Sequence, residues 1–370
     1  MSKSGSARLP LHGGSAPSWL FDRMEELGGA ISQVIIEEYG RDELLRRLSD
    51  PYWFQAFGCV LGFDWHSSGL TTTTMGALKE ALEPEEHGVA VLGGKGGASR
   101  RTPEEIEELE AVYNLRSSLT EELKESSRMS AKVDNSMVQD SYTLYHHTFV
   151  LSEDGDWAVV QQGMGEKSAR RYHWLSDNVE GFVEEPQDAI ASMERREEVL
   201  DLTSERSESA REISVDLVND DPSHLKRYFR EGGQSTLDRF TAGKREVPEL
   251  KMPMRHRLRE EDLTERSVEQ LEKAYEVQPG DYRELASIEG VGPKSLRALA
   301  LISELVHDAE ASREDPAKYS YAHGGKDGTP YPVDRDRYDE SVRHVKEALG
   351  RSDVDGKEKR KALKRLHEFT

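Results

Sequence analysis

Long hydrophobic runs and cysteine are what this 370-residue sequence most clearly lacks. No apolar stretch approaches the roughly 20 residues of a membrane-spanning helix, and the first residues lack the apolar segment of a signal peptide. Cys59 is the only cysteine, so a disulfide framework is excluded and a reducing compartment suits the chain. We therefore expect a soluble, cytoplasmic protein that does not contact a membrane.

Positive charge is scarce as well. The sequence holds 71 Asp and Glu against 50 Lys and Arg, which gives a net charge of −21, and only 18 of the basic residues are Lys. An acidic surface in which Arg replaces much of the Lys is typical of proteins adapted to molar salt, so we expect a halophilic protein. Salt weakens phosphate binding that is driven by counterion release. Local charge, not net charge, therefore has to indicate a nucleic-acid partner.

The most informative motif is the run Ile288-Glu289-Gly290-Val291-Gly292-Pro293-Lys294. The glycines suit a tight turn, and Pro293 is typical of the first position of a helix. The flanking residues predict a helix-hairpin-helix at about residues 281–307. Free backbone N–H groups at a helix start bind anions, and the usual anion in this arrangement is a DNA phosphate. We expect DNA as the partner, held independently of base sequence by Gly290, Val291, Gly292 and Lys294.

A basic segment precedes this hairpin. Residues 223–259 contain ten basic residues and four acidic ones, the reverse of the balance in the whole chain. The segment predicts a second phosphate contact, which would include Arg255, Arg257 and Arg259. A solvated helical face is the alternative interpretation.

A glycine-rich run in the first half also favours phosphate binding. The apolar residues 89–92 predict a strand, and residues 93–101 follow it with Lys95, Arg100 and Arg101 among glycines. Such a loop is a candidate phosphate cradle. It lacks the spacing of a nucleotide-hydrolysing P-loop. Thr102 and Glu105 have the spacing of a capping box, which predicts a helix from this point.

A β-hairpin is predicted where two apolar segments, 147–151 and 157–162, flank the turn residues 152–156. In that hairpin His147 would face Gln161 or Gln162. Nucleases with a restriction-enzyme fold place a metal-binding Asp before such a hairpin, a role open to Asp140, but the Glu-x-Lys expected on the second strand is missing. No metal ligands are predicted, and a divalent metal is expected only if the chain is a nuclease. If the first domain is catalytic, the candidates are His66, Lys95, Asp140, His146, His147 and Gln161.

Two other functions are consistent with the hairpin. In helix-hairpin-helix DNA glycosylases a Lys follows the glycine turn and an Asp follows a Pro-Val-like pair. Lys294 and Asp334 resemble these positions, and they would form a Schiff base and stabilise the departing base. Asp334 could equally cap a following helix. The remaining alternative is an adaptor without catalytic activity, which uses the hairpin to dock a protein partner.

The elements change character near residue 186. Strand signals precede it, whereas 189–200 and 205–219 are charged and favour helices. We predict an α+β protein in two parts. Residues 1–190 form a mixed domain of helices and strands with a polar surface of His, Gln, Arg and Lys. Residues 191–370 form an all-α domain that carries the helix-hairpin-helix.

Several strings in the sequence resemble one family. They are Leu9–Gly14, Asp64–Gly69, Gly93–Gly96, Leu144–His147, Val160–Met164, Arg171–Trp174, the hairpin turn and His323–Gly328. Together they resemble the domain-of-unknown-function 763 family of archaeal and bacterial proteins, over nearly the whole chain. The resemblance transfers no catalytic residue to this sequence.

Overall fold

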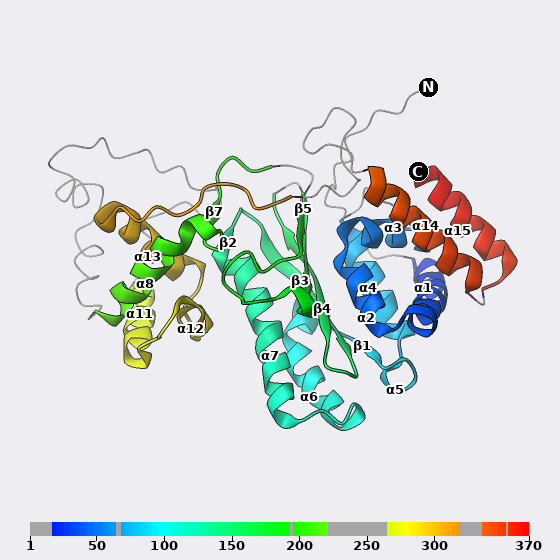
Figure 1. The fold of residues 1–370 in the computed structure, drawn as a ribbon, viewed down its shortest axis with the longest axis horizontal. Helices are drawn as coiled ribbons and strands as arrows, with labels where there is room; N and C mark the ends of the chain where they lie inside the picture. Colours follow the sequence, from blue (N-terminus) through cyan, green and yellow to red (C-terminus); the bar gives the residue numbers. More distant parts are fainter. Residues whose placement is uncertain are drawn as a thin grey trace.

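The computed structural model describes residues 17–63, 68–166, 168–192, 195–220, 265–318, 335–352 and 354–369. A five-stranded antiparallel sheet stands between two helical layers (Figure 1). In sheet order its strands are β1 Val89–Lys95, β3 Thr143–Ser152, β4 Trp157–Met164, β5 Ala169–Leu175 and β6 Ala189–Ala191. A separate short ribbon pairs β2 (Val138–Gln139) with β7 (Leu200–Asp201). As expected, the protein mixes helices and strands, with its main sheet in the N-terminal half.

Both faces of the sheet are buried, and the strand sequences show why. In β1, Val89 and Val91 contact the core on one side, while Ala90 and Leu92 contact the core on the other. Successive strand residues point to opposite faces, so a strand covered on both sides needs a nearly continuous apolar run. The strand predicted from residues 89–92 is confirmed, and it continues to Lys95.

One helical layer combines the earliest and latest helices of the described chain. They are α1 Ser18–Tyr39, α2 Arg41–Ser49, α3 Pro51–Leu61, α4 Gly69–Ala81, α14 Arg335–Arg351 and α15 Gly356–Phe369. Every residue of α3 is buried, and Asp50 caps its start by accepting the Tyr52 backbone N–H at 2.8 Å. Both α14 and α15 contact α3, and they lie beside it in Figure 1. Residues 335–369 thus complete a core that begins at residue 18, while the division at residue 190 stays a prediction.

The other layer comes from the middle of the chain. Its helices are α6 Thr102–Val112, α7 Ser117–Lys132, α8 Glu208–Asn219, α11 Glu265–Val277, α12 Tyr282–Ser287 and α13 Pro293–His307. They share one core with sheet residues such as Phe149 and Trp174. Short helical segments are α5 Pro84–His87, η1 Gly96–Arg101, the π-helical η2 Val133–Met137, η3 Ser176–Asn178 and η4 Glu205–Ser207. None of the described helices is long and apolar enough to cross a membrane.

The predicted β-hairpin and the helices around the glycine turn are present. Strands β3 and β4 join through residues 153–156, and α13 begins at Pro293 as expected. A helix predicted over 189–200 is wrong. Its first three residues are apolar and pair with β5 as strand β6, and the Arg196 backbone N–H donates to the Asp315 carboxylate at 2.6 Å. Sheet pairing and this tertiary contact outweigh the helical propensity of the charged residues that follow.

The capping box predicted at Thr102 is also wrong. Thr102 is the first residue of α6, Arg101 holds the cap position, and the Thr102 hydroxyl donates to the Ser99 carbonyl at 3.0 Å. Glu105 accepts the Gly93 backbone N–H and forms an ion pair with Lys79 at 2.9 Å. Glu105 thus fixes the glycine-rich end of β1 to α4 and α6 instead of closing the helix start.

Candidate functional site

Polar side chains form two rows that cross the middle of the sheet. Because the strands are in antiparallel register, residues that are distant in sequence lie opposite each other. The first row contains Lys95, His146, Gln162 and Arg171, and the second contains His147, Gln161 and Tyr172. Neighbouring residues of a strand face opposite sides, so the rows face opposite helical layers. Of the two partners predicted for His147, Gln161 is the one that faces it, while Gln162 faces His146.

The second row continues into α7 through a chain of hydrogen bonds. The Oε1 atom of Gln161 lies 2.8 Å from Nδ1 of His147. On the other side of the ring, Nε2 of His147 lies 3.0 Å from the hydroxyl of Ser127. Gln161 also donates from Nε2 to the Ser130 carbonyl at 3.0 Å and to Oδ2 of Asp134. The chain therefore links Asp134, Gln161, His147 and Ser127, all of which are buried.

Asp134 ends this chain in the protein interior. It stands in the π-helical segment η2, and it accepts hydrogen bonds from Trp174 Nε1 at 2.9 Å and from Gln187 Nε2 at 2.7 Å. Burial raises the pKa of Asp134 to about 7, against the effect of these neutral donors. Burial lowers the pKa of His147 to about 4, although the bond to Gln161 opposes this shift. His147 is therefore neutral at pH 7.

The first row faces α3 and α4. Gln162 accepts from the Thr71 hydroxyl at 2.5 Å and donates to the hydroxyl of Tyr145. Arg171 donates to Gln55 Oε1 at 3.0 Å. His146 differs from these residues, because neither of its ring nitrogens has a hydrogen-bond partner in the described part of the chain. Burial, with the nearby His147 and Lys95, lowers the pKa of His146 to about 3.

A cleft opens where β3, α7 and η1 meet. Its volume is about 550 Å³, and it is lined by Ser99, Arg100, Pro103, Ser127, Arg128, Ala131, Lys132, Asn135, Ser136, Thr143, Leu144, Tyr145, His146 and His147. Three of these residues carry positive charge, and none of the described lining residues is Asp or Glu. Lys95 lies beside the cleft, with Nζ 6.0 Å from the centre of the Tyr145 ring. The cleft is thus a basic site in an acidic protein.

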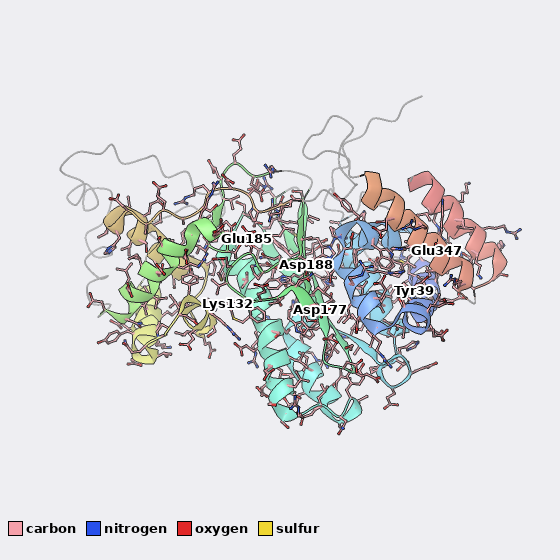
Figure 2. All side chains as sticks on the ribbon, viewed as in Figure 1. Tyr39, Lys132, Asp177, Glu185, Asp188 and Glu347 are labelled. Atoms are coloured by element: carbon pink, nitrogen blue, oxygen red, sulfur yellow. The ribbon has the colours of Figure 1, made fainter. Side chains whose placement is uncertain are left out.

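The cleft reaches the glycine turn through Lys132. The Lys132 ammonium donates to the carbonyl of Ile288, the residue that follows α12, at 3.3 Å, and Figure 2 places Lys132 on the side of α7 near α12. Gln139 strengthens this junction by donating to the Pro293 carbonyl at 2.8 Å. Burial lowers the pKa of Lys132.

The basic character ends on the other side of Lys132. A second cavity of about 750 Å³ shares Arg128 and Lys132 with the cleft, but its other lining residues include Glu121, Glu122, Glu125 and Glu289. An anionic ligand is therefore favoured on the His147 side of Lys132 and opposed on the glutamate side.

Within the turn, the two glycines meet different requirements. Gly290 has a φ of 94°, which disfavours any residue with a side chain. Gly292 has an ordinary extended φ of −128°, and a Cβ there would meet only the Gly290 carbonyl, at 4.0 Å. Val291 between them is fully buried, while Lys294 is exposed at the second position of α13. Neither backbone strain nor packing explains why position 292 lacks a side chain.

Asp140 lies away from the cleft, in a buried ion pair. Its Oδ2 accepts from Arg170 at 2.7 Å and from the Tyr172 hydroxyl at 2.9 Å. Arg170 also makes two bonds to Asp315, at 2.9 and 2.7 Å. Burial raises the pKa of Asp140, against the charge of Arg170. The structure thus surrounds Asp140 with structural partners and does not bring it together with His147.

Several predicted site residues lie outside the described part of the chain: His66, Arg255, Arg257, Arg259 and Asp334. Of the others, Arg100, His146 and His147 line the cleft, Lys95 borders it, Arg101 is exposed beside Arg100, and Gln161 lies behind His147. Sequence reasoning missed Ser127 and Arg128 as lining residues. Ser127 lies four residues before Ala131 on α7, and Arg128 lies four residues before Lys132, so each pair shares one side of the helix. This spacing could have indicated them. In the described ranges no three His, Cys, Asp or Glu side chains are grouped as metal ligands.

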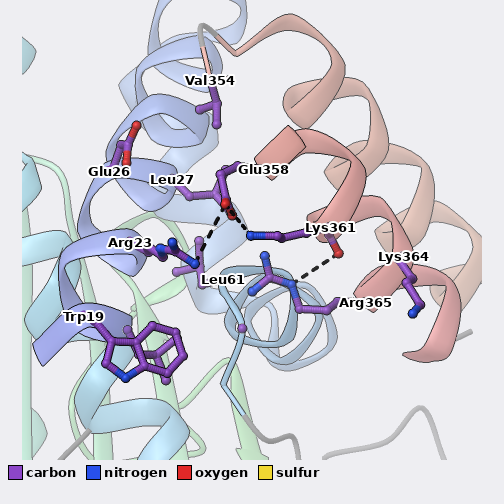
Figure 3. A pocket seen from close by; sticks show the side chains of 12 residues that line it. Trp19, Arg23, Glu26, Leu27, Leu61, Val354, Glu358, Lys361, Lys364 and Arg365 are labelled. Carbon is purple, nitrogen blue, oxygen red and sulfur yellow. Dashed lines mark hydrogen bonds and ion pairs between the residues drawn. The ribbon is translucent and has the colours of Figure 1, made fainter. Parts of the chain in front are cut away.

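A smaller pocket of about 350 Å³ lies between α1 and α15, at the basic end of the chain. Figure 3 shows Trp19 and Arg23 of α1 opposite Glu358, Lys361 and Arg365 of α15. Glu358 pairs with Lys361 at 2.6 Å and with Arg23 at 3.8 Å, so part of the positive charge is neutralised.

The model of the protein family described as "Protein of unknown function (DUF763)" matches residues 5–333. The chain therefore belongs to this family. The matched range includes the sheet, the cleft and the glycine turn, and it ends before α14 and α15. No curated protein and no solved structure matches the chain.

Proposed function

We propose that this DUF763 family member is a DNA-binding protein that acts in DNA processing or repair. In this proposal α12, the glycine turn and α13 form a helix-hairpin-helix that binds the phosphate backbone. The backbone N–H groups at the start of α13 would bind a phosphate, and the exposed ammonium of Lys294 would add charge. Binding of this kind is independent of base sequence.

The absence of a side chain at Gly292 is the observation that carries the proposal. The backbone there is extended, and space for a side chain is available. A ligand that approaches the backbone closely would need that space. A phosphate at a helix N-terminus is such a ligand, because its oxygens must come within hydrogen-bonding distance of main-chain N–H groups.

The cleft supports the same proposal by its position and charge. Arg100, Arg128 and Lys132 would place further positive charge along a strand of DNA that leaves the turn. The glutamates on the other side of Lys132 would repel it. The favoured path therefore runs from Gly292 over Lys132 toward β3, and it brings the DNA to His147.

Binding of labelled duplex and single-stranded DNA, measured by fluorescence anisotropy over a potassium chloride series, tests the proposal. Lys294→Glu should weaken binding and reduce the slope of log affinity against log salt by about 1. Lys346→Glu is the matched control, because it changes the net charge equally at an exposed position on α14. Unchanged affinity in Lys294→Glu, or an equal loss in both variants, would rule out the hairpin contact. A wild-type chain that binds no DNA would favour the adaptor alternative.

A further inference from the structure

The hydrogen bonds around Gln161 determine which nitrogen of His147 carries a proton. A carbonyl oxygen only accepts hydrogen bonds, so the atom of Gln161 that contacts the Ser130 carbonyl must be its NH₂ group. The same NH₂ group donates to Oδ2 of Asp134, which also accepts from Trp174. The amide oxygen of Gln161 therefore faces His147, and Nδ1 of His147 must be the donor in that contact.

This arrangement leaves Nε2 of His147 as a base. A neutral imidazole with its proton on Nδ1 has a lone pair on Nε2. The only described partner of that lone pair is the Ser127 hydroxyl, 3.0 Å away, which must donate to it. A serine that donates to a histidine, whose other nitrogen is oriented by a third group, has the geometry of an activated nucleophile.

Such a network could merely fill a core, but its position distinguishes it from a packing contact. Ser127 and His147 both line the cleft, and so do Arg100, Arg128 and Lys132. Cations beside a nucleophile stabilise the negative charge that develops when a phosphate group is attacked. Asp134 stands in a π-helical segment directly after α7, and such segments are frequent at functional sites.

We propose that Ser127 and His147 are a nucleophile and its general base for cleavage of a phosphodiester held in the cleft. This inference rests on the proposed function for the identity of the substrate, a DNA strand. Gln161 and Asp134 act as positioning residues, because they hold the His147 ring and do not reach the cleft themselves.

The reaction needs no oxidant and no co-reactant except water. Ser127 Oγ forms a bond to phosphorus, its proton moves to His147 Nε2, and the bond from phosphorus to one deoxyribose oxygen breaks. The imidazolium returns the proton to that oxygen, which leaves as a hydroxyl group. A phosphoserine ester to the other strand end remains. Water then gives a proton to His147 and attacks phosphorus, and Ser127 Oγ leaves and takes the proton back.

The first experiment looks for the covalent ester. The wild-type chain is mixed with end-labelled single-stranded and duplex DNA, quenched in detergent, and separated on a denaturing gel. A labelled protein band whose peptide carries DNA on Ser127 is the expected result. Ser127→Ala should abolish both the band and the cut DNA. His147→Gln should slow cleavage by about 100-fold or more.

Ser126→Ala is the matched control, since Ser126 is the neighbouring residue on α7 and its hydroxyl donates to the Glu122 carbonyl. It should form the ester at the wild-type rate. Cleavage by Ser127→Ala at the wild-type rate, or an ester on another residue, would overturn the inference.

A second measurement uses the wild-type chain without DNA. A fluorophosphonate reagent should attach to Ser127 with loss of fluoride, and peptide mass spectrometry locates it. Tight DNA binding with neither ester nor labelling would overturn the nucleophile and leave the DNA-binding proposal standing. Labelling of Ser127 that requires His147, in a chain that does not bind DNA, would support the nucleophile and reject DNA as its substrate.

The positioning role of Gln161 has its own readout. The nitrogen chemical shifts of the imidazole ring report which nitrogen is protonated. We expect Nδ1–H at His147 in the wild-type chain, and a mixture of tautomers in Gln161→Met with reduced labelling of Ser127. An unchanged tautomer in a folded Gln161→Met chain would show that Gln161 only packs.

Discussion

Asp134 and Asp140 are both fully buried and close in sequence, yet they are held in opposite ways. Asp134 receives hydrogen bonds from neutral groups, namely the side chains of Gln161, Trp174 and Gln187. Asp140 faces the guanidinium of Arg170, which also binds Asp315. Burial raises the pKa of Asp134 to about 7, although its neutral donors oppose the rise. Burial also raises the pKa of Asp140, but there the opposing influence is the charge of Arg170, which Asp140 shares with Asp315.

The difference separates two uses of a buried carboxylate. The Asp134 group ends a chain of hydrogen bonds that reaches the cleft through His147. Arg170 of β5 donates to both Asp140 and Asp315, so the Asp140 group belongs to an ion-pair cluster in which Arg170 ties together parts of the chain that are 145 residues apart. One carboxyl group is suited to orienting a base, and the other holds the fold together.

The largest expected effect follows from removal of Arg170. Arg170→Met leaves Asp140 and Asp315 as buried carboxylates without their cation, which should lower the free energy of unfolding by about 3–5 kcal/mol. Urea unfolding followed by circular dichroism measures the change. The exposed pair of Arg206 and Glu314 is the control, because Arg206→Ala should cost at most about 1 kcal/mol. Equal losses in the two variants would mean that Asp140 is not held mainly by charge.

A pH series tests how burial without an opposite charge shifts the ionisation of His146 and Asp134. The pKa of His146 is about 3 in the folded chain, below its ordinary value of 6.5. Its stabilising contribution is therefore complete above pH 6.5 and is lost as the pH falls from 6.5 toward 3. The raised pKa of Asp134 gives the opposite pH dependence. Its contribution to the free energy of unfolding is lost as the pH rises from 3.8 through about 7.

His146→Gln should flatten the acid side of the stability profile, measured by urea unfolding at fixed pH values from 7.5 to 3.5. His307→Gln, at an exposed position at the end of α13, is the matched control and should keep the wild-type slope. A wild-type slope retained in His146→Gln would contradict burial of a neutral ring at this position.

A smaller effect is expected from Gln187, whose amide donates to Oδ1 of Asp134 at 2.7 Å. Gln187→Met removes one donor that lowers the pKa of Asp134, so the pKa should rise above its value of about 7. Carbon NMR titration of the carboxyl group measures this rise. The free energy of unfolding should fall by about 1–2 kcal/mol. An unchanged pKa would mean that the neutral donors do not set the ionisation of Asp134.

The smallest effect on stability is expected at Gly292. Gly292→Val should leave the free energy of unfolding within about 0.5 kcal/mol, since the backbone is extended and the space is open. DNA affinity should nevertheless fall, as measured by anisotropy. Gly350→Val, at a position where a Cβ would meet nothing within 4 Å, should retain full affinity. A large loss of stability in Gly292→Val would give the glycine a structural reason and weaken the proposed phosphate contact.

Local patterns were enough to predict much of this fold. The apolar run at Val89, the hairpin turn and the start of α13 at Pro293 were visible because each depends on neighbouring residues. The strand β6 was missed, since a three-residue strand depends on pairing with β5 and not on its own sequence. The site was predicted only in part, because some of its residues meet through local pairing and others through tertiary packing. His147 and Gln161 face each other across a hairpin, whereas Ser127 and Arg128 reach the cleft through the packing of α7 on the sheet.

The burial of α3 has a consequence for how the chain is made. Its eleven residues are covered by α1, α2 and α4 and by α14 and α15, which come almost 300 residues later. During synthesis at about 5–20 residues per second, an emerging α3 would wait many seconds for its cover. Until then Trp53, Phe54 and Phe57 form an exposed hydrophobic surface that chaperones and other nascent chains can bind. A chain truncated before residue 335 would contain all the residues of the sheet and the cleft. Its α3 would nevertheless lack the cover of α14 and α15.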